Sequence, residues 1–240
     1  MNHKIRYLYL PVGGTGERLK ADCPHLRYES KCFLEIGGTL LLTRILDAFL
    51  PYVEELVVVY CTEAQRTRLE RYFRDADLSH PVRLLRDPPD ADPYSLVPAD
   101  GDVLAVMGDS YVPQETVSAF LESVRRDPRL TFLRFLPERT NQPTAYYRQE
   151  GDRITDWSPS VREGYAYLEI GQLLYFPKDC VCDLGARCSR DQAIHVLREL
   201  IVTCGGANCL DLPCYNINTG SEYDRVLALA SREDGGTEEP

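Results

Sequence analysis

The sequence predicts an α/β protein with a doubly wound, mostly parallel (Rossmann-like) central sheet and a small antiparallel extension over the mouth of its site. Apolar runs typical of buried strands alternate with amphipathic, helix-like segments as far as residue 127. From Leu130 onward, short segments rich in aromatic and β-branched residues follow one another, which is typical of antiparallel strands. The 240 residues suffice for one large domain with a substantial core.

The first half of the chain carries the alternating elements. Buried strands are expected at 5–12, 55–61, 82–86 and 103–109. Helices are expected at 39–53, 62–73 and 113–127, where apolar residues recur at three- and four-residue spacing. Ligands of such sheets bind beyond the carboxyl ends of the strands, so the residues that follow each strand are the first candidates for a site.

The second half of the chain is expected to form the antiparallel extension and then a further helix, strand and closing helix. Strands are expected at 130–136, 144–149, 152–157 and 165–176, with a hairpin turn at 149–152. A helix at 189–202, a last strand at 209–217 and a closing helix at 221–230 follow. We therefore predict a single domain over residues 1–230 and a disordered polar tail over 231–240.

Composition excludes several classes of protein. A formal net charge of −10 argues against a nucleic-acid surface, because phosphate backbones recruit basic faces. No apolar run reaches the length of a membrane span, and the apolar start leads straight into glycines, as a first strand does and a signal peptide does not. These features predict a cytoplasmic protein that binds neither nucleic acid nor membrane.

The nine cysteines indicate reduced thiols, since the number is odd and no secretory signal precedes them. Six of them fall between Cys180 and Cys214, without the paired CxxC spacing of structural zinc sites. A zinc site in this segment stays open as the alternative.

A glycine-rich turn follows the first predicted strand. The residues expected to surround a phosphate group there are Pro11, Val12, Gly13, Gly14, Thr15 and Gly16. Glycines allow the backbone to approach a ligand, and backbone N–H groups with nearby cations, here Arg18 and Lys31, bind phosphate oxygens. A P-loop is excluded because Glu17-Arg18-Leu19 follows Gly16, and a dinucleotide GxGxxG is incomplete because Leu19 replaces its third glycine.

The stretch GGTGERL, then Lys31, then LEIGGTLLLTRILDAF resembles the opening of the sugar-1-phosphate nucleotidyltransferases and their MobA-like relatives. Their pattern is GGxGxRL, a later Pro-Lys, then LxxIGG and a helix; Ser30 stands here in place of the proline. The resemblance implies transfer of a nucleotide from an NTP to a phosphorylated sugar, alcohol or phosphonate, with release of pyrophosphate. It also implies a nucleotide-binding half over residues 1–129 and an acceptor-binding half over 130–220.

The same resemblance implies catalytic and metal-binding residues. VLAVMGD resembles the strand whose last aspartate holds the catalytic Mg²⁺, which assigns that role to Asp109 beside the catalytic cations Arg18 and Lys31. YNINTGSEYD resembles the element with the second metal ligand and places Asn216 there, with Asn218 as the alternative. The alternative is structural: Asp109 caps the helix that starts near Pro113 or is a turn residue, and Asn218 and Thr219 form a turn that caps the last helix.

Substrate contacts are expected in two regions. Tyr94 and Ser95 resemble the base-binding element of the choline-phosphate cytidylyltransferase branch, which favours CTP. Tyr146, Trp157 and Glu169 are candidate acceptor-binding residues, with packing in the core as the alternative for the aromatic ones.

Two other functions stay open. One is a non-catalytic nucleotide- or sugar-nucleotide-binding protein of the same fold. The other is an NAD(P)-dependent oxidoreductase, for which Glu35 lies at the right distance from the glycines but in the wrong context. The sequence fixes neither base, acceptor nor oligomeric state, and a homo-oligomer is compatible with it.

Overall fold

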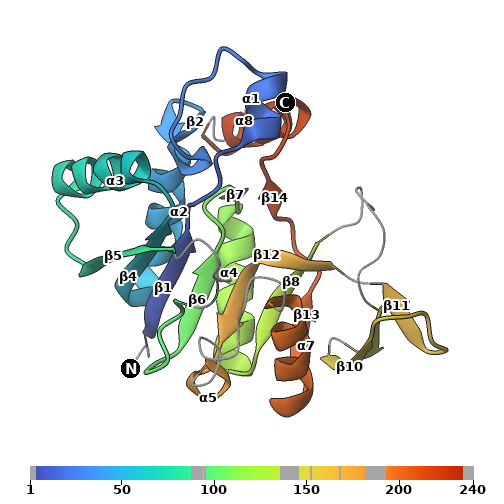
Figure 1. Cartoon of the computed structure of the whole chain (residues 1–240). Helices are drawn as coiled ribbons and strands as arrows, with labels where there is room; N and C mark the ends of the chain where they lie inside the picture. Colours follow the sequence, from blue (N-terminus) through green and yellow to red (C-terminus); the bar gives the residue numbers. More distant parts are fainter. Residues whose placement is uncertain are drawn as a thin grey trace, which may run out of the picture.

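The computed structural model describes residues 4–87, 94, 96–135, 146–151, 153–167, 169–181 and 193–234. One ten-stranded sheet runs through the molecule (Figure 1). Its strands are β1 (Ile5–Pro11), β4 (Val53–Tyr60), β5 (Val82–Arg86), β6 (Val103–Val106), β8 (Thr131–Phe135), β9 (Tyr146–Glu150), β10 (Arg153–Ser158), β11 (Tyr165–Tyr167), β12 (Glu169–Phe176) and β13 (Ala207–Leu210). Two small ribbons pair β2 (Glu35–Ile36) with β3 (Thr39–Leu40), and β7 (Ser110–Tyr111) with β14 (Tyr215–Asn216).

Helices and 3-10 turns connect these strands. They are α1 (Glu17–Asp22), η1 (Lys31–Phe33), α2 (Leu41–Phe49), η2 (Leu50–Tyr52), α3 (Glu63–Ala76), α4 (Gln114–Arg126), α5 (Lys178–Val181), α7 (Ala193–Thr203) and α8 (Gly220–Asp234).

The strand order is β11-β9-β10-β13-β8-β12-β6-β1-β4-β5. Strands β6, β1, β4 and β5 are parallel, and they form the core predicted from the alternating pattern. Strand β12 runs antiparallel between β6 and β8, while β13 returns parallel to β8. The antiparallel strands β10, β9 and β11 continue the same sheet, so both halves of the chain share it.

Both faces of the sheet are covered, as the doubly wound prediction requires. Along β1, Leu8 and Leu10 face a core that contains apolar residues of α2 and α4. Tyr7 and Tyr9 face a second core with residues of α5 and α7. This alternation follows from the two-residue period of a strand, and it explains why β1 has no polar face.

Four predicted elements have other bounds in the structure. The expected helix at 39–53 is reduced to α2 and the turn η2, and the expected strand at 165–176 is two strands, β11 at the sheet edge and β12 between β8 and β6. The expected strand at 209–217 is divided between β13 and β14, which lie in different sheets, because Pro213 cannot donate to a ladder. The closing helix continues through Asp234, where Arg44 binds Asp234 and the Tyr111 hydroxyl donates to Glu233. The first four residues of the expected tail are therefore helical, and 235–240 lie outside the described residues.

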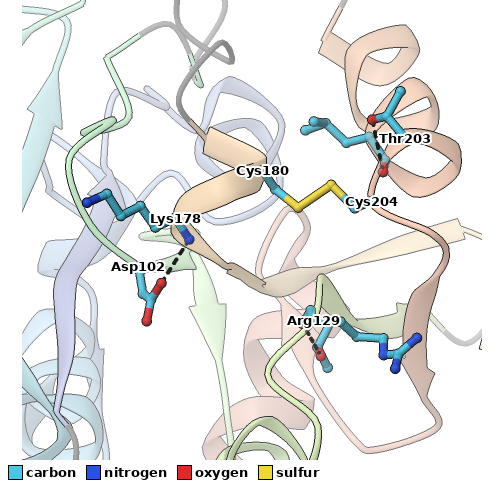
Figure 2. The surroundings of a disulfide bond; sticks show 8 residues. Asp102, Arg129, Lys178, Cys180, Thr203 and Cys204 are labelled. Carbon is cyan, nitrogen blue, oxygen red and sulfur yellow. Dashed lines mark hydrogen bonds between the residues drawn. A yellow bond between two sulfur atoms is a disulfide. The ribbon is translucent and has the colours of Figure 1, made fainter.

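The expectation that the cysteines are reduced is wrong for one pair. A disulfide joins Cys180 of α5 to Cys204 at the end of α7 (Figure 2). Cys23, Cys32, Cys61, Cys209 and Cys214 are thiols, and Cys182 and Cys188 lie outside the described residues. Within the described ranges no group of three or more His, Cys, Asp or Glu side chains could hold a metal, and no helix there could cross a membrane.

Candidate active site

A buried lysine joins three distant parts of the chain at the carboxyl edge of the parallel strands. The ammonium Nζ of Lys31 lies 2.5 Å from Oδ2 of Asp109 and 2.6 Å from Oδ1 of Asn218. Lys31 is 6% exposed, so these two oxygens replace most of the water contacts of its ammonium group. The Asp109 side chain is 24% exposed, which leaves part of its carboxylate open to a ligand.

Asp109 is placed by a close approach of two strand ends. The N–H of Gly108 donates to the carbonyl of Pro11 at 2.9 Å, and a Cβ on Gly108 would lie 2.6 Å from Cγ1 of Val12. Only glycine permits this contact without a shift of β1. On the other side, the N–H of Ile217 donates to the Asp109 carbonyl at 2.9 Å. The aspartate is thus held between the glycine-rich turn and β14.

The glycine-rich turn leaves β1 and packs on the end of β4. A Cβ on Gly13 would lie 2.1 Å from Sγ of Cys61, and Gly16 adopts a φ of 69°, so both positions require glycine. Gly14 and Thr15 are exposed. The backbone between Val12 and Gly16 is therefore shaped as a turn that an anionic ligand can reach beside Lys31.

The side chain of Gln65 ties this turn to two other segments, and sequence reasoning did not single it out. Its Nε2 donates to the carbonyls of Gly13 (3.2 Å) and Glu29 (3.3 Å). Its Oε1 accepts from the N–H groups of Cys61 (2.9 Å) and Thr62 (3.1 Å), and the residue is 0% exposed. The capping box that Thr62 and Gln65 form at the start of α3 is the signal that could have identified it.

Asn218 is oriented by the start of α8. Its N–H donates to Oε2 of Glu222 at 2.9 Å, and the same oxygen accepts from the Thr219 hydroxyl at 2.9 Å. The Gly220 N–H donates to Asp22 of α1 at 3.0 Å. The turn-and-cap interpretation of this segment therefore holds, and the same turn delivers the Asn218 side chain to Lys31.

The two candidate asparagines have different surroundings. Asn218 shares the Lys31 ammonium with Asp109, whereas Asn216 lies in β14 opposite Ser110. The Oδ1 atom of Asn216 is buried and has no hydrogen-bond partner among the described residues. The structure thus joins Asn218 to Asp109 through Lys31, while Asn216 makes no hydrogen bond to that carboxylate in the part of the chain that is described.

The donor set at this point fits Mg²⁺. A carboxylate oxygen of Asp109 and an amide oxygen of Asn218 converge on one cationic centre, the Lys31 ammonium. Mg²⁺ prefers oxygen ligands and takes one or two from the protein, with water and phosphate oxygens completing its shell.

The remaining predicted residues are not gathered at this point. Arg18 is exposed on α1 and forms no ion pair with the described residues. Tyr94 is 8% exposed and its ring meets Phe176 edge to face, so it is a core residue and not an open surface for a base. Ser95 lies outside the described residues.

Two of the predicted acceptor residues, Tyr146 of β9 and Trp157 of β10, lie on the antiparallel extension of the sheet. The Arg198 guanidinium lies 4.8 Å from the ring centroid of Trp157, and Tyr146 is partly buried on the neighbouring strand β9. Glu169 begins β12, but its side chain lies outside the described part of the chain.

A glycine-rich turn after β1, with a buried lysine and a carboxylate at the same sheet edge, defines the class of nucleotidyltransferases with a doubly wound fold. Residues 10–203 match the family model of the MobA-like NTP transferase domain, and the chain belongs to that family. No curated protein sequence matches the chain significantly.

Solved structures share the fold across nearly the whole chain. The inositol-1-phosphate CTP transferase from T. maritima is 16% identical, with a TM-score of 0.67 over 97% of this chain and 98% of the other. An apo UDP-glucose pyrophosphorylase is 11% identical, with a TM-score of 0.71 over 96% and 99%. A putative glucose-1-phosphate thymidylyltransferase from Bacillus anthracis is 12% identical, with a TM-score of 0.69 over 94% of each chain.

Proposed function

We propose that the protein transfers a nucleoside monophosphate from an NTP to a phosphorylated small molecule and releases pyrophosphate. The observation that carries the proposal is the convergence of Lys31, Asp109 and Asn218 beside the glycine-rich turn. A buried lysine with a partly open carboxylate at the phosphate-binding edge of the sheet suits the stabilisation of phosphate charge during transfer.

In the proposed reaction, an oxygen of the acceptor phosphate attacks the α-phosphorus of the NTP. The new P–O bond forms as the bond between the α-phosphorus and the bridging oxygen breaks, and pyrophosphate leaves with that electron pair. The acceptor oxygen is already anionic, so no side chain has to remove a proton. The chain supplies positioning and positive charge, which are the main terms in phosphoryl-type transfer.

Each part of the site has a role in that proposal. The backbone of Val12–Gly16 binds the triphosphate, and Lys31 neutralises charge on the α-phosphate. Arg18, exposed next to the turn, reaches the outer phosphates. Asp109 and Asn218 would hold Mg²⁺, which would neutralise charge on the phosphate oxygens. We infer Asn218 as the second ligand in preference to Asn216, because only Asn218 shares a partner with Asp109.

The base and the acceptor are finer parts of the proposal. We favour CTP, supported by the T. maritima neighbour, whose name describes a CTP transferase. The acceptor is a phosphorylated sugar, alcohol or phosphonate, the class to which the substrates in the neighbours' names belong. We place the enzyme in the cytoplasm.

Pyrophosphate release tests the proposal. The protein is incubated with Mg²⁺, each of CTP, UTP, ATP, GTP and dTTP, and a panel of phosphorylated sugars, alcohols and phosphonates. We expect release with one NTP and one acceptor, and a loss of at least about a hundredfold in Asp109→Ala. Glu115→Ala, which removes an exposed carboxylate of α4, is the matched control and keeps full activity.

The negative outcomes are distinct. NTP binding that requires Mg²⁺ but yields no pyrophosphate would favour the non-catalytic binding protein. An absence of NTP binding under all these conditions would overturn the transferase proposal.

A further inference from the structure

A large cavity lies at the opposite edge of the sheet from the candidate active site. Its volume is about 700 Å³, within the range of about 300–1,000 Å³ that small-molecule sites occupy. The cavity forms where β1 and β6 begin and where β12 and α4 end. The cavity lies at the amino ends of β1 and β6, whereas Gly13 and Asp109 come after their carboxyl ends. The cavity is therefore separate from the site at Lys31.

Two exposed cations line this cavity together with the Asp102 carboxylate. Lys4 and Arg125 line it, both are exposed, and neither forms an ion pair with the described residues. The Arg125 guanidinium lies 5.5 Å from the ring centroid of Tyr52, which also lines the cavity. In a chain of net charge −10, two exposed cations at one cavity that form no ion pair with the described residues favour an anionic ligand there.

The remaining walls offer an acceptor and an apolar surface. Oδ1 of Asp102 accepts from the Lys178 N–H at 2.8 Å (Figure 2), and the Tyr175 hydroxyl also donates to Asp102. A carboxylate has about four lone-pair sites, so Asp102 can accept further hydrogen bonds from a ligand. The partly exposed Tyr52 ring and the side chain of Leu121 form an apolar wall suited to a flat ring.

We propose that this cavity is a second small-molecule site, and that it binds a phosphorylated molecule with a planar ring and hydroxyl groups, the chemistry of a nucleoside monophosphate. Lys4 and Arg125 bind the phosphate, and Tyr52 packs against the ring. Asp102 accepts from a sugar hydroxyl or an exocyclic amine.

Hydrogen exchange followed by mass spectrometry locates the binding. The probes are CMP and AMP, compared with cytidine and adenosine, which lack the phosphate. We expect both monophosphates to protect peptides that cover 4–8, 50–54 and 101–104, and the nucleosides to protect them much less. Peptides over 12–18 and 107–110 report the active site separately, so a failure of the proposed transferase function leaves this measurement readable.

A matched pair of variants tests the phosphate contact. Arg125→Glu reverses a cation that lines the cavity, and we expect it to weaken monophosphate affinity about tenfold or more. Arg126→Glu makes the same change at the next position of α4, where the side chain is 75% exposed and pairs with Glu122 outside the cavity lining. We expect that variant to bind as the wild type does.

Three results would overturn the inference. The first is protection confined to the peptides over 12–18 and 107–110, or no protection at all. The second is equal loss of affinity in Arg125→Glu and Arg126→Glu. The third is equal protection by the nucleosides, which would show that the cations do not bind a phosphate.

Discussion

At the scale of single residues, mutation can show which of the two asparagines near the C-terminus, Asn216 or Asn218, is the second Mg²⁺ ligand. Asn218→Ala removes the oxygen that shares Lys31 with Asp109, and we expect the Mg²⁺ concentration for half-maximal pyrophosphate release to rise about tenfold or more. Asn216→Ala removes a buried amide without a hydrogen bond at Oδ1, and we expect no change in Mg²⁺ dependence. The reverse pattern would identify Asn216 as the ligand.

A second residue-scale prediction concerns the thiols near the site. Burial raises the pKa of both Cys32 and Cys214 to about 12, which disfavours the reactive thiolate at pH 8. Cys61 is exposed and lies against Gly13. We expect iodoacetamide to label Cys61 much faster than the other two in the folded protein, as read by peptide mass spectrometry.

A bound triphosphate should protect that thiol, because the turn at Gly13 is its proposed binding surface. We therefore expect CTP with Mg²⁺ to slow the labelling of Cys61. Unfolding in guanidinium is the control, since it should make all three cysteines react alike. Unchanged labelling of Cys61 at a CTP concentration that supports turnover would contradict the proposed position of the triphosphate.

At the scale of elements, the start of α3 holds the glycine-rich turn through Gln65. Gln65→Leu leaves two carbonyls and two N–H groups without their partner, so we expect a loss of stability of about 1–3 kcal/mol. We also expect a higher KM for the NTP, because the turn loses its link to the 29–31 segment. Thr62→Ala removes the cap alone and should cost about 1 kcal/mol with KM unchanged.

Urea unfolding and initial rates at varied NTP concentration measure the two effects. A KM that rises equally in Gln65→Leu and Thr62→Ala would show that helix stability, and not the contact with Gly13, controls NTP binding. A KM that stays at the wild-type value in both variants would show that Gln65 does not position the turn for NTP binding.

The elements also show how far the sequence predicts this structure. Strands such as β5 and the capped start of α3 follow from local patterns, as do the aspartate after β6 and the glycines after β1. The position of β12 between β6 and β8 does not, since sequence periodicity carries no information on which strands pair. Lys31 and Asn218 are 187 residues apart, and only the folded sheet brings them together.

At the scale of the whole molecule, the C-terminal helix α8 contacts segments that adjoin the site. Arg44 pairs with Asp234, the Tyr111 hydroxyl donates to Glu233 at 2.5 Å, and the Tyr223 hydroxyl donates to the Glu35 carbonyl at 2.8 Å. Tyr111 lies in β7, directly after the strand end that carries Asp109. The end of α8 therefore helps to fix the segment on which the proposed metal ligand stands.

Truncation tests this link between the C-terminal helix and the site. Ending the chain after Arg232 removes Glu233 and Asp234, and we expect the thermal midpoint to fall by about 2 °C or more and activity to fall with it. Ending the chain after Asp234 removes only 235–240 and is the matched control. Equal behaviour of the two truncations would mean that the contacts of the last helical turn contribute nothing.

The disulfide joins α5 to the residue after α7, on the face of the sheet to which Tyr7 and Tyr9 point. Cys180 and Cys204 are 24 residues apart in sequence, and closing a loop of this length stabilises a protein by about 3 kcal/mol in the chain-entropy account. We expect dithiothreitol, or Cys180→Ser, to lower the free energy of unfolding by about that amount. Cys61→Ser, which replaces an exposed thiol, is the control and should leave stability unchanged.

Alkylation distinguishes two ways in which α5 and α7 can be held together: by the Cys180–Cys204 disulfide or by apolar packing alone. If the disulfide persists, iodoacetamide added to the unfolded, unreduced protein will modify neither Cys180 nor Cys204, and reduction will expose both. Because cytosolic thiols are usually kept reduced, the bond would then form only under oxidising conditions, and stability would differ between the two redox states. Modification of both cysteines before reduction would show instead that α5 and α7 are held together by apolar packing of residues such as Val181 and Ile201.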